Sequence, residues 1–205
     1  MIKCLHLPRE PFTLLVSGGV DSIAAAHWLK VIYRKEFSIL HFNHNIQSAN
    51  ADMESAVSSF AKTFEIPIKT IIRSADTKMT HEHELRDWRL FEMAKIGGNF
   101  ITGHHLNDCV ENYIDNCLKG TPEYKPINES TKFDKFTIYH PFLTTKKQYF
   151  IDYCDTNDLN KFTVTDPTNS ENDFKRNWIR NKLAKEIYDR NIGIEKVVLK
   201  KFYLQ

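Results

Sequence analysis

The chain has 205 residues, of which 41% are hydrophobic and 26% charged, and its formal net charge is +2, as in one ordinary globular core with at most a small appendage. No apolar stretch approaches the roughly 20 residues of a membrane span, and residues 1–10 contain no signal-peptide core. Four scattered cysteines without a C-x-x-C pair argue for reduced thiols and against a zinc or iron–sulfur site, so we expect a cytoplasmic protein that does not bind membranes.

Apolar runs and helical patterns alternate along the chain. This alternation predicts an α/β fold, with a Rossmann-like parallel sheet covered by helices on both faces. Ligands of such sheets bind at the carboxyl ends of the strands. Gly97 and Gly98 are expected to cap a helix, and residues 120–137 are expected to form a surface loop. The predicted strands are 13–17, 37–42, 66–72, 99–102 and 162–165, and the predicted helices are 20–33, 51–64, 82–96, 107–119, 145–157 and 173–190.

The first predicted strand runs into the loop Ser17-Gly18-Gly19-Val20-Asp21-Ser22. Adjacent glycines let the backbone approach a ligand, and the helix that follows presents unpaired N–H groups to an anion. The loop lacks the lysine of a Walker-type P-loop. Its hydroxyls and the Asp21 carboxylate suit a pyrophosphate leaving group with a divalent cation. It resembles the loop of the ATP pyrophosphatases; the alternative is an ordinary strand-to-helix turn.

Polar clusters follow two further predicted strands. His41 and His44 follow the second strand, where imidazoles could bind a base, a ribose or a phosphate, or be structural. Asp108 and Glu111 lie three residues apart on one predicted helix, after His104. Both carboxylates therefore face the same side and could hold a metal or bind and deprotonate an amine. The alternative for Asp108 is a favourable interaction with the helix dipole.

Paired arginines occur on two predicted helices. Arg86 and Arg89 share one face, and so do Arg176 and Arg180, a spacing that suits phosphate contacts as well as a solvated surface. From residue 173 onward, nine Lys/Arg and four Asp/Glu give +5, which leaves −3 for the rest. This basic C-terminal segment is compatible with an RNA backbone contact or with a solvated helix face.

The order of these motifs over about residues 12–183 resembles the tRNA(Ile)-lysidine synthetase family, of the adenine nucleotide alpha hydrolase or PP-loop type. The resemblance implies a ligase that uses ATP and Mg²⁺ to adenylate the wobble cytidine in the anticodon loop of an isoleucine tRNA (CAU anticodon). L-lysine then displaces AMP to form lysidine. The motifs are SGGVDS, HFNHNIQSANAD, E-x-x-x-R-x-x-R from Glu82, GHHLNDCVEN, HPFL from His140 and DPTNSENDFKRNWIR.

The resemblance also implies roles for single residues. It places the metal on Asp21 and the activation of lysine on Asp108 and Glu111, with Asp21 also catalytic. The implied ATP-binding residues are Ser17, Gly18, Gly19, Val20, Asp21, Ser22, His44 and His104, and the implied substrate or tRNA contacts are Arg86, Arg89, Asn169, Arg176, Asn177 and Arg180.

The chain departs from the family in three places. Asn107 stands where the family has an acid, which predicts a weaker metal or lysine contact, and His140 replaces an arginine that could contact phosphate. The sequence stops soon after the last motif, whereas bacterial members continue into C-terminal domains. We therefore expect a short form, with a catalytic domain over 1–172 and a basic helical extension over 173–205 packed on it.

Two other functions fit part of the pattern. One is another PP-loop enzyme that modifies a tRNA base, such as a 2-thiolating enzyme, although these typically need a cysteine pair that this chain lacks. The other is a tRNA-binding relative without catalysis, against which the intact loop, Asp108 and Glu111 argue. The sequence leaves the oligomeric state open.

Overall fold

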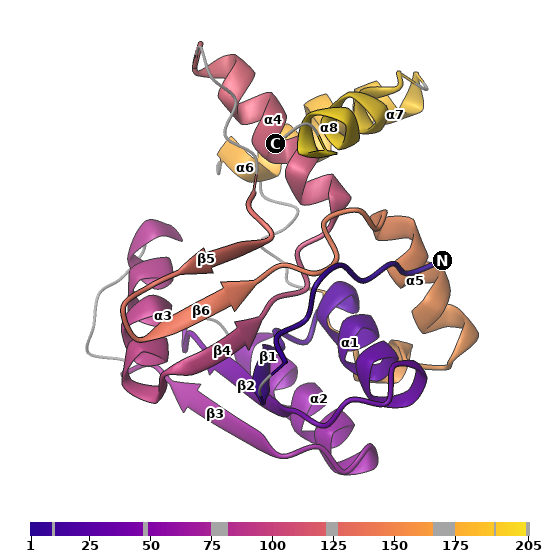
Figure 1. Cartoon of the computed structure of the whole chain (residues 1–205). Helices are drawn as coiled ribbons and strands as arrows, with labels where there is room; N and C mark the ends of the chain where they lie inside the picture. The colour runs from indigo at the N-terminus through magenta and orange to yellow at the C-terminus, as the bar shows by residue number, and fades with distance from the viewer. Residues whose placement is uncertain are drawn as a thin grey trace.

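The computed structural model describes residues 1–9, 11–46, 49–74, 82–121, 127–165, 175–190 and 192–203. Within them, no helix is long and apolar enough to cross a membrane. Helices cover both faces of a central sheet, and a further group of helices stands beyond one of its edges (Figure 1).

The sheet has six strands in the order β3-β2-β1-β4-β6-β5. All neighbouring pairs are parallel except β5 and β6, so the predicted parallel sheet is confirmed. Leu14 of β1 lies opposite Ile39 of β2 and Ile101 of β4, all three fully buried, because a central strand is covered on both faces. The strands are β1 (Phe12–Leu15), β2 (Ser38–Asn43), β3 (Ile68–Ile72), β4 (Gly98–Ile101), β5 (Ser130–Lys132) and β6 (Phe136–Tyr139).

Two strand predictions were wrong. Residues 162–165 do not form a strand: Phe162 ends a short 3-10 turn, η2 (Asn160–Phe162), and packs into the core. Residues 120–137 were expected to be a loop, but β5 and the start of β6 lie there. The apolar side chains of β6, Phe136 and Ile138, are buried against Phe100 of β4, which explains why this segment pairs with the sheet.

The first five helices match the predicted ones closely. On one face of the sheet, α1, α2 and α5 bury a core that includes Ile23, Phe60 and Phe150. On the other face, α3 packs Met93 against Phe100. The helices are α1 (Val20–His27), continued by the π-helical turn η1 (Trp28–Ile32), then α2 (Ala49–Thr63), α3 (Glu82–Ile96), α4 (Leu106–Leu118) and α5 (Lys147–Thr156). Gly97 follows α3 with φ of +73° and donates to the carbonyl of Met93, as predicted for a helix cap.

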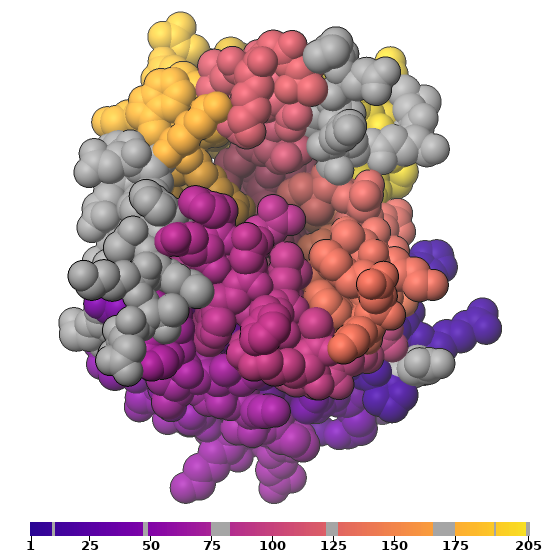
Figure 2. Space-filling model, turned by 90° about the vertical axis from the view of Figure 1, so that its left-hand side faces the viewer, coloured from indigo at the N-terminus to yellow at the C-terminus, as the bar shows by residue number. Residues whose placement is uncertain are grey.

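The C-terminal segment folds into helices that pack on α4. These are α6 (Lys175–Trp178), the π-helical turn η4 (Ile179–Ala184), α7 (Lys185–Asp189) and α8 (Ile194–Tyr203). Ile179 and Val198 are buried against Val110 and Ile114 of α4 in a cluster of their own. In Figure 2, α4 and the C-terminal helices form the upper part of the molecule and α3 the centre of the view, with the surface hollowed between them.

Candidate functional site

The candidate site lies where the chain order in the sheet reverses. The strands that follow β1 run outward on one side through β2 to β3, and β4 begins the other side. Parallel sheets bind ligands in the crevice at the carboxyl ends of such a strand pair. The loop after β1 and the segment after β4 meet there. A Cβ on Gly103 would lie 3.5 Å from the backbone of Ser22, so the two segments pack closely.

The loop after β1 is held in shape by its own side chains. The Ser22 hydroxyl donates to the Gly19 carbonyl at 2.9 Å and accepts from the Ser17 amide at 3.2 Å. Gly18 has φ of +93°, a conformation that favours glycine, and a Cβ there would lie 3.4 Å from Met53. Val20 and Asp21 begin α1, so that its first amides face the crevice. The loop therefore holds its shape through its own hydrogen bonds and through close packing on Met53.

Asp21 is linked to Asp108 through His105. The Nε2 atom of His105 lies 3.4 Å from Oδ1 of Asp21, and its Nδ1 lies 3.3 Å from Oδ2 of Asp108. His105 caps α4, and its backbone amide donates to Oδ2 of Asp108 at 2.9 Å. One buried imidazole thus connects the loop after β1 with the first turn of α4.

Two arginines neutralise the acidic pair on α4. Asp108 and Glu111 are both buried, only 7% and 6% exposed. Nη2 of Arg176 donates to Oδ1 of Asp108 at 2.9 Å, and its Nε donates to Oε2 of Glu111 at 3.2 Å. Arg180 donates to both oxygens of Glu111, from Nε at 2.6 Å and from Nη2 at 3.0 Å. The acidic pair and the last arginine pair, 65 or more residues apart in sequence, form one cluster.

The local charges keep Asp108 ionised. Burial alone would raise the pKa of Asp108, but the positive charges of His105 and Arg176 hold it well below its usual range. Burial alone would lower the pKa of His105, but Asp108 and Asp21 outweigh this effect and raise it. Asp108 is therefore a carboxylate, and His105 favours its protonated form beside it.

Two further histidines meet beside the cluster. Oγ1 of Thr102 lies 3.0 Å from Nδ1 of His104 and 2.6 Å from Nδ1 of His140. Burial lowers the pKa of both imidazoles, that of His140 to about 3 with a contribution from His104. Both histidines are therefore neutral around pH 7. His140, where the resemblance implies an arginine, is an uncharged hydrogen-bonding group.

The remaining predicted site residues are placed less centrally. His44 follows β2 and packs its ring 5.5 Å from that of Trp88 on α3. Arg86 is exposed on α3, and the charge of Arg89 on the same helix lowers the pKa of His104. Asn177 lies between the two arginines of the cluster in sequence and is half-buried. Asn169 lies outside the described residues.

Two residues near the cluster were not predicted from the sequence, and a third, Asn107, makes contacts that the sequence did not predict. His105 was within a recognised motif but was not singled out, and Lys147 of α5, which lies 4.0 Å from Asp21, gave no signal. Asn107 was expected to weaken a metal or lysine contact, because it stands where an acid was expected. Its Oδ1 accepts from the amide of Lys147 at 2.9 Å and its Nδ2 donates to the Tyr188 hydroxyl at 3.0 Å. Through these two hydrogen bonds Asn107 joins α4 to α5 and α7.

The environment of Asp21 fits a divalent cation. Its Oδ1 is buried and forms no hydrogen bond of normal geometry with the described residues. A carboxylate oxygen beside a phosphate cradle is the ligand set that Mg²⁺ uses when it retains water and binds phosphate oxygens. Asp21, with the hydroxyls of Ser17 and Ser22 nearby, would hold such an ion.

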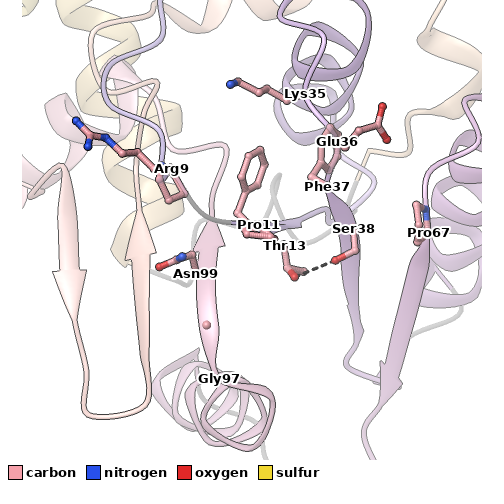
Figure 3. Close-up of a pocket in the computed structure, with 13 residues that line it drawn as sticks. Arg9, Pro11, Thr13, Lys35, Glu36, Phe37, Ser38, Pro67, Gly97 and Asn99 are labelled. Carbon is pink, nitrogen blue, oxygen red and sulfur yellow. Dashed lines mark hydrogen bonds between the residues drawn. The ribbon is translucent and has the colours of Figure 1, made fainter.

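A separate hollow of about 620 Å³ opens at the amino ends of the strands (Figure 3). It is lined by residues at or near the starts of β1, β2 and β4, among them Thr13, Ser38 and Asn99. The Thr13 and Ser38 hydroxyls lie 2.9 Å apart within it. This hollow is at the opposite edge of the sheet from the acidic pair, and we assign the chemistry to the carboxyl edge, where the charged groups gather.

Known proteins resemble this chain over most of its length. The family described as PP-loop domain matches residues 3–187. The tRNA(Ile)-lysidine synthase of Exiguobacterium sibiricum is 25% identical over 200 residues, which cover 95% of this chain and 48% of that protein. The enzyme of the same name from Streptococcus pyogenes is 30% identical over 179 residues, covering 82% of this chain and 39% of that protein. The chain thus spans about half the length of these relatives, or less.

A solved structure shows the same fold. The U34-tRNA thiolase of Methanococcus maripaludis, determined with its [4Fe-4S] cluster, superposes with a TM-score of 0.75 at 13% identity. The match covers 95% of this chain and 71% of that one. At this identity the likeness describes the arrangement of strands and helices and leaves the chemistry open.

Proposed function

Because the chain belongs to the PP-loop domain family, which implies the use of ATP, we propose that it modifies the wobble cytidine of an isoleucine tRNA with lysine. The C2 carbonyl oxygen of the cytidine attacks the α-phosphate of ATP, and pyrophosphate leaves. The amine of lysine then attacks C2, and the oxygen departs with AMP. The products are a lysidine base, AMP and pyrophosphate.

The loop after β1 carries the first half of this reaction. The amides at the start of α1 and the hydroxyls of Ser17 and Ser22 bind the phosphates, with His44 and His104 as further ATP contacts. Mg²⁺ on Asp21 would neutralise charge on the departing pyrophosphate. Lys147, 4.0 Å from Asp21, adds a positive charge beside the same phosphates.

The acidic pair carries the second half. An ionised Asp108 beside Glu111 is a site for an ammonium group, and holding lysine there converts a bimolecular attack into a local one. Because the pKa of Asp108 is held low, it binds and orients the ammonium better than it removes a proton. The neutral imidazole of His104 is the nearby group able to accept the proton of the attacking amine.

The observation that carries the proposal is the continuous contact from Asp21 through His105 to Asp108 and Glu111. Through His105 and Arg176 it connects the loop after β1 to the acidic pair, so that ATP and an amine bound at these two places would lie close together. The curated relatives named tRNA(Ile)-lysidine synthase support the same substrate pair.

The cysteines support attack by an amine rather than by sulfur. Burial raises the pKa of Cys4, Cys109 and Cys154 to about 12. A thiolate is the reactive form of cysteine, and these three side chains remain thiols at neutral pH. These three cysteines therefore do not favour a sulfur-transfer reaction of the thiolase type.

The test is direct. The purified protein is incubated with an isoleucine tRNA carrying a CAU anticodon, Mg²⁺, ATP and radiolabelled lysine, and the nucleosides are then analysed by mass spectrometry. Lysine should enter the RNA only when ATP is present, at the wobble cytidine. RNA that stays unlabelled at every salt concentration, or a nucleoside that gains sulfur, would overturn the proposal.

A further inference from the structure

We propose that the Arg176 guanidinium occupies the place of the lysine ammonium between Asp108 and Glu111, and that lysine displaces it on binding. The inference rests on the proposed function, because it takes the acidic pair as the lysine site. It assigns Arg176 as a positioning residue that lysine replaces, rather than as a permanent contact to RNA.

The first support is the bridging geometry of Arg176. Its guanidinium spans both carboxylates, with a 2.9 Å contact to Asp108 and a 3.2 Å contact to Glu111. A cation held between two buried carboxylates is the arrangement that a bound ammonium would have. An ammonium has three donors on one compact centre, so it can satisfy the same two carboxylates in the same space.

The second support is the balance of charge. Two buried carboxylates already face two guanidinium groups, since Arg180 also contacts Glu111 and lies 3.7 Å from Asp108. A lysine ammonium added to this cluster would be a further cation beside carboxylates that two guanidinium groups and His105 already face, in a poorly hydrated region, which is costly. Exchange of one guanidinium for the ammonium keeps the balance.

The third support is the difference between the two arginines. Arg180 forms a forked pair with both oxygens of Glu111 and its side chain is 28% exposed, whereas that of Arg176 is 42% exposed. Arg176 lies on α6, which buries no residue, whereas η4 is anchored by the buried Ile179 and Ala184. Arg176 can therefore swing out with little loss of packing, and Arg180 remains as the anchor.

Equilibrium dialysis with radiolabelled lysine tests the displacement in the full-length protein. Arg176→Ala should tighten lysine binding by about tenfold, because the site no longer has to be vacated first. Arg176→Gln, which keeps a polar side chain of similar length, should also tighten it. Arg190→Ala is the matched control: Arg190 pairs at 2.6 Å with Glu186 on the exposed face of α7, and its loss should leave lysine affinity unchanged.

A second measurement uses the unaltered protein. Saturating lysine should speed amide hydrogen exchange over residues 175–184, since α6 loses its contact with the acidic pair, while exchange in α5 stays constant. Lysine binding without faster exchange there would overturn the displacement, and so would unchanged or weaker binding by folded Arg176 variants. If no variant binds lysine, the proposed function fails, and the displacement fails with it.

Discussion

Asp108 receives contacts from two sides, from His105 at the start of its own helix and from Arg176 at the C-terminal end of the chain. Asp108→Asn keeps the shape but removes the negative charge that would hold an ammonium. We expect lysine transfer to fall by about 100-fold or more, as when a charged partner is lost from a buried site. ATP binding by the loop after β1 should persist, and dialysis with labelled ATP measures it.

The control for this variant lies on the same helix. Asp115 also pairs with lysines, Lys119 and Lys175, yet it is outside the proposed site. Asp115→Asn should leave lysine transfer nearly unchanged. If folded Asp108→Asn loses ATP binding as well, the division of roles between the loop and the acidic pair is wrong.

His140 should make the protein sensitive to acid. Its pKa is lowered to about 3 by burial and His104, so the folded state keeps it neutral, whereas the unfolded chain protonates it below about pH 6.5. The stability contributed by the neutral imidazole is therefore present above pH 6.5 and is lost as the pH falls toward 3. The loss approaches about 1.4 kcal/mol per pH unit.

Urea unfolding of the wild type and of His140→Gln between pH 7 and pH 4 measures this effect. The free energy of unfolding of the wild type should fall more steeply than that of the variant, because acids elsewhere contribute equally to both. Parallel curves would mean that folding does not lower the pKa of His140.

Single residues show which contacts the sequence could predict and which it could not. The spacing of Asp108 and Glu111, and that of Arg176 and Arg180, placed each pair on one helix face. Nothing in the spacing said that the two faces meet, because that depends on how the C-terminal helices pack on α4. For the same reason the sequence did not predict that Asn107 would bond to Lys147 of α5 and Tyr188 of α7.

At the level of elements, periodicity predicted the parallel core and its helices. It failed where a segment depends on its neighbours. β5 is the polar stretch Ser130–Lys132, which becomes a strand only by pairing with β6. Residues 162–165 have strand-like composition, yet the amide of Val164 donates to the Gly18 carbonyl of the loop at 2.9 Å. They support the site instead of extending the sheet.

α4 is the element that joins the two halves of the molecule. Its first two turns carry Asp108 and Glu111, and Val110 and Ile114 pack in one cluster with Ile179 and Val198. Ile179→Ala removes a fully buried side chain from this cluster and should cost about 2–5 kcal/mol of unfolding free energy. It should also weaken lysine transfer, because η4 positions Arg180.

Ile192→Ala is the matched control, since Ile192 is 55% exposed in the same C-terminal region. Its unfolding free energy should stay within about 0.5 kcal/mol of the wild type in urea denaturation. A similar loss in both variants would mean that the helices beyond α4 are not anchored through Ile179.

At the scale of the whole molecule, the structure refines the basic surface expected of the C-terminal segment. Arg176, Arg180, Lys175, Lys185 and Arg190 have carboxylate partners within the chain. On α8, by contrast, the ion pairs among the described residues include none with Lys196, Lys200 or Lys201. All three lysines are exposed. The division into a catalytic unit over 1–172 and an extension over 173–205 remains a proposal, which this distribution of charge supports.

The α8 lysines should therefore carry much of the RNA backbone contact. Replacing all three with alanine should weaken RNA binding and reduce the slope of log affinity against log salt by about 2–3. The control is a double variant, Lys62→Ala with Lys69→Ala. These residues lie on α2 and β3, far from α8 in Figure 1, so the slope should stay unchanged. Filter binding over a range of salt concentrations measures both. Equal slopes for the two sets of variants would mean that α8 does not contact the RNA backbone and is an ordinary solvated surface.

The hydrogen bond from Val164 to Gly18 also bears on how the protein is made. During synthesis, β1, β2 and β4 are available once residue 101 has emerged from the ribosome, so the central strands can pair early. The hydrogen bond to the loop after β1 can form only once Val164 has been synthesised, and the contacts to the acidic pair only once Arg176 and Arg180 have been. A nascent chain can thus form its central strands first and the contacts around the loop after β1 and the acidic pair last.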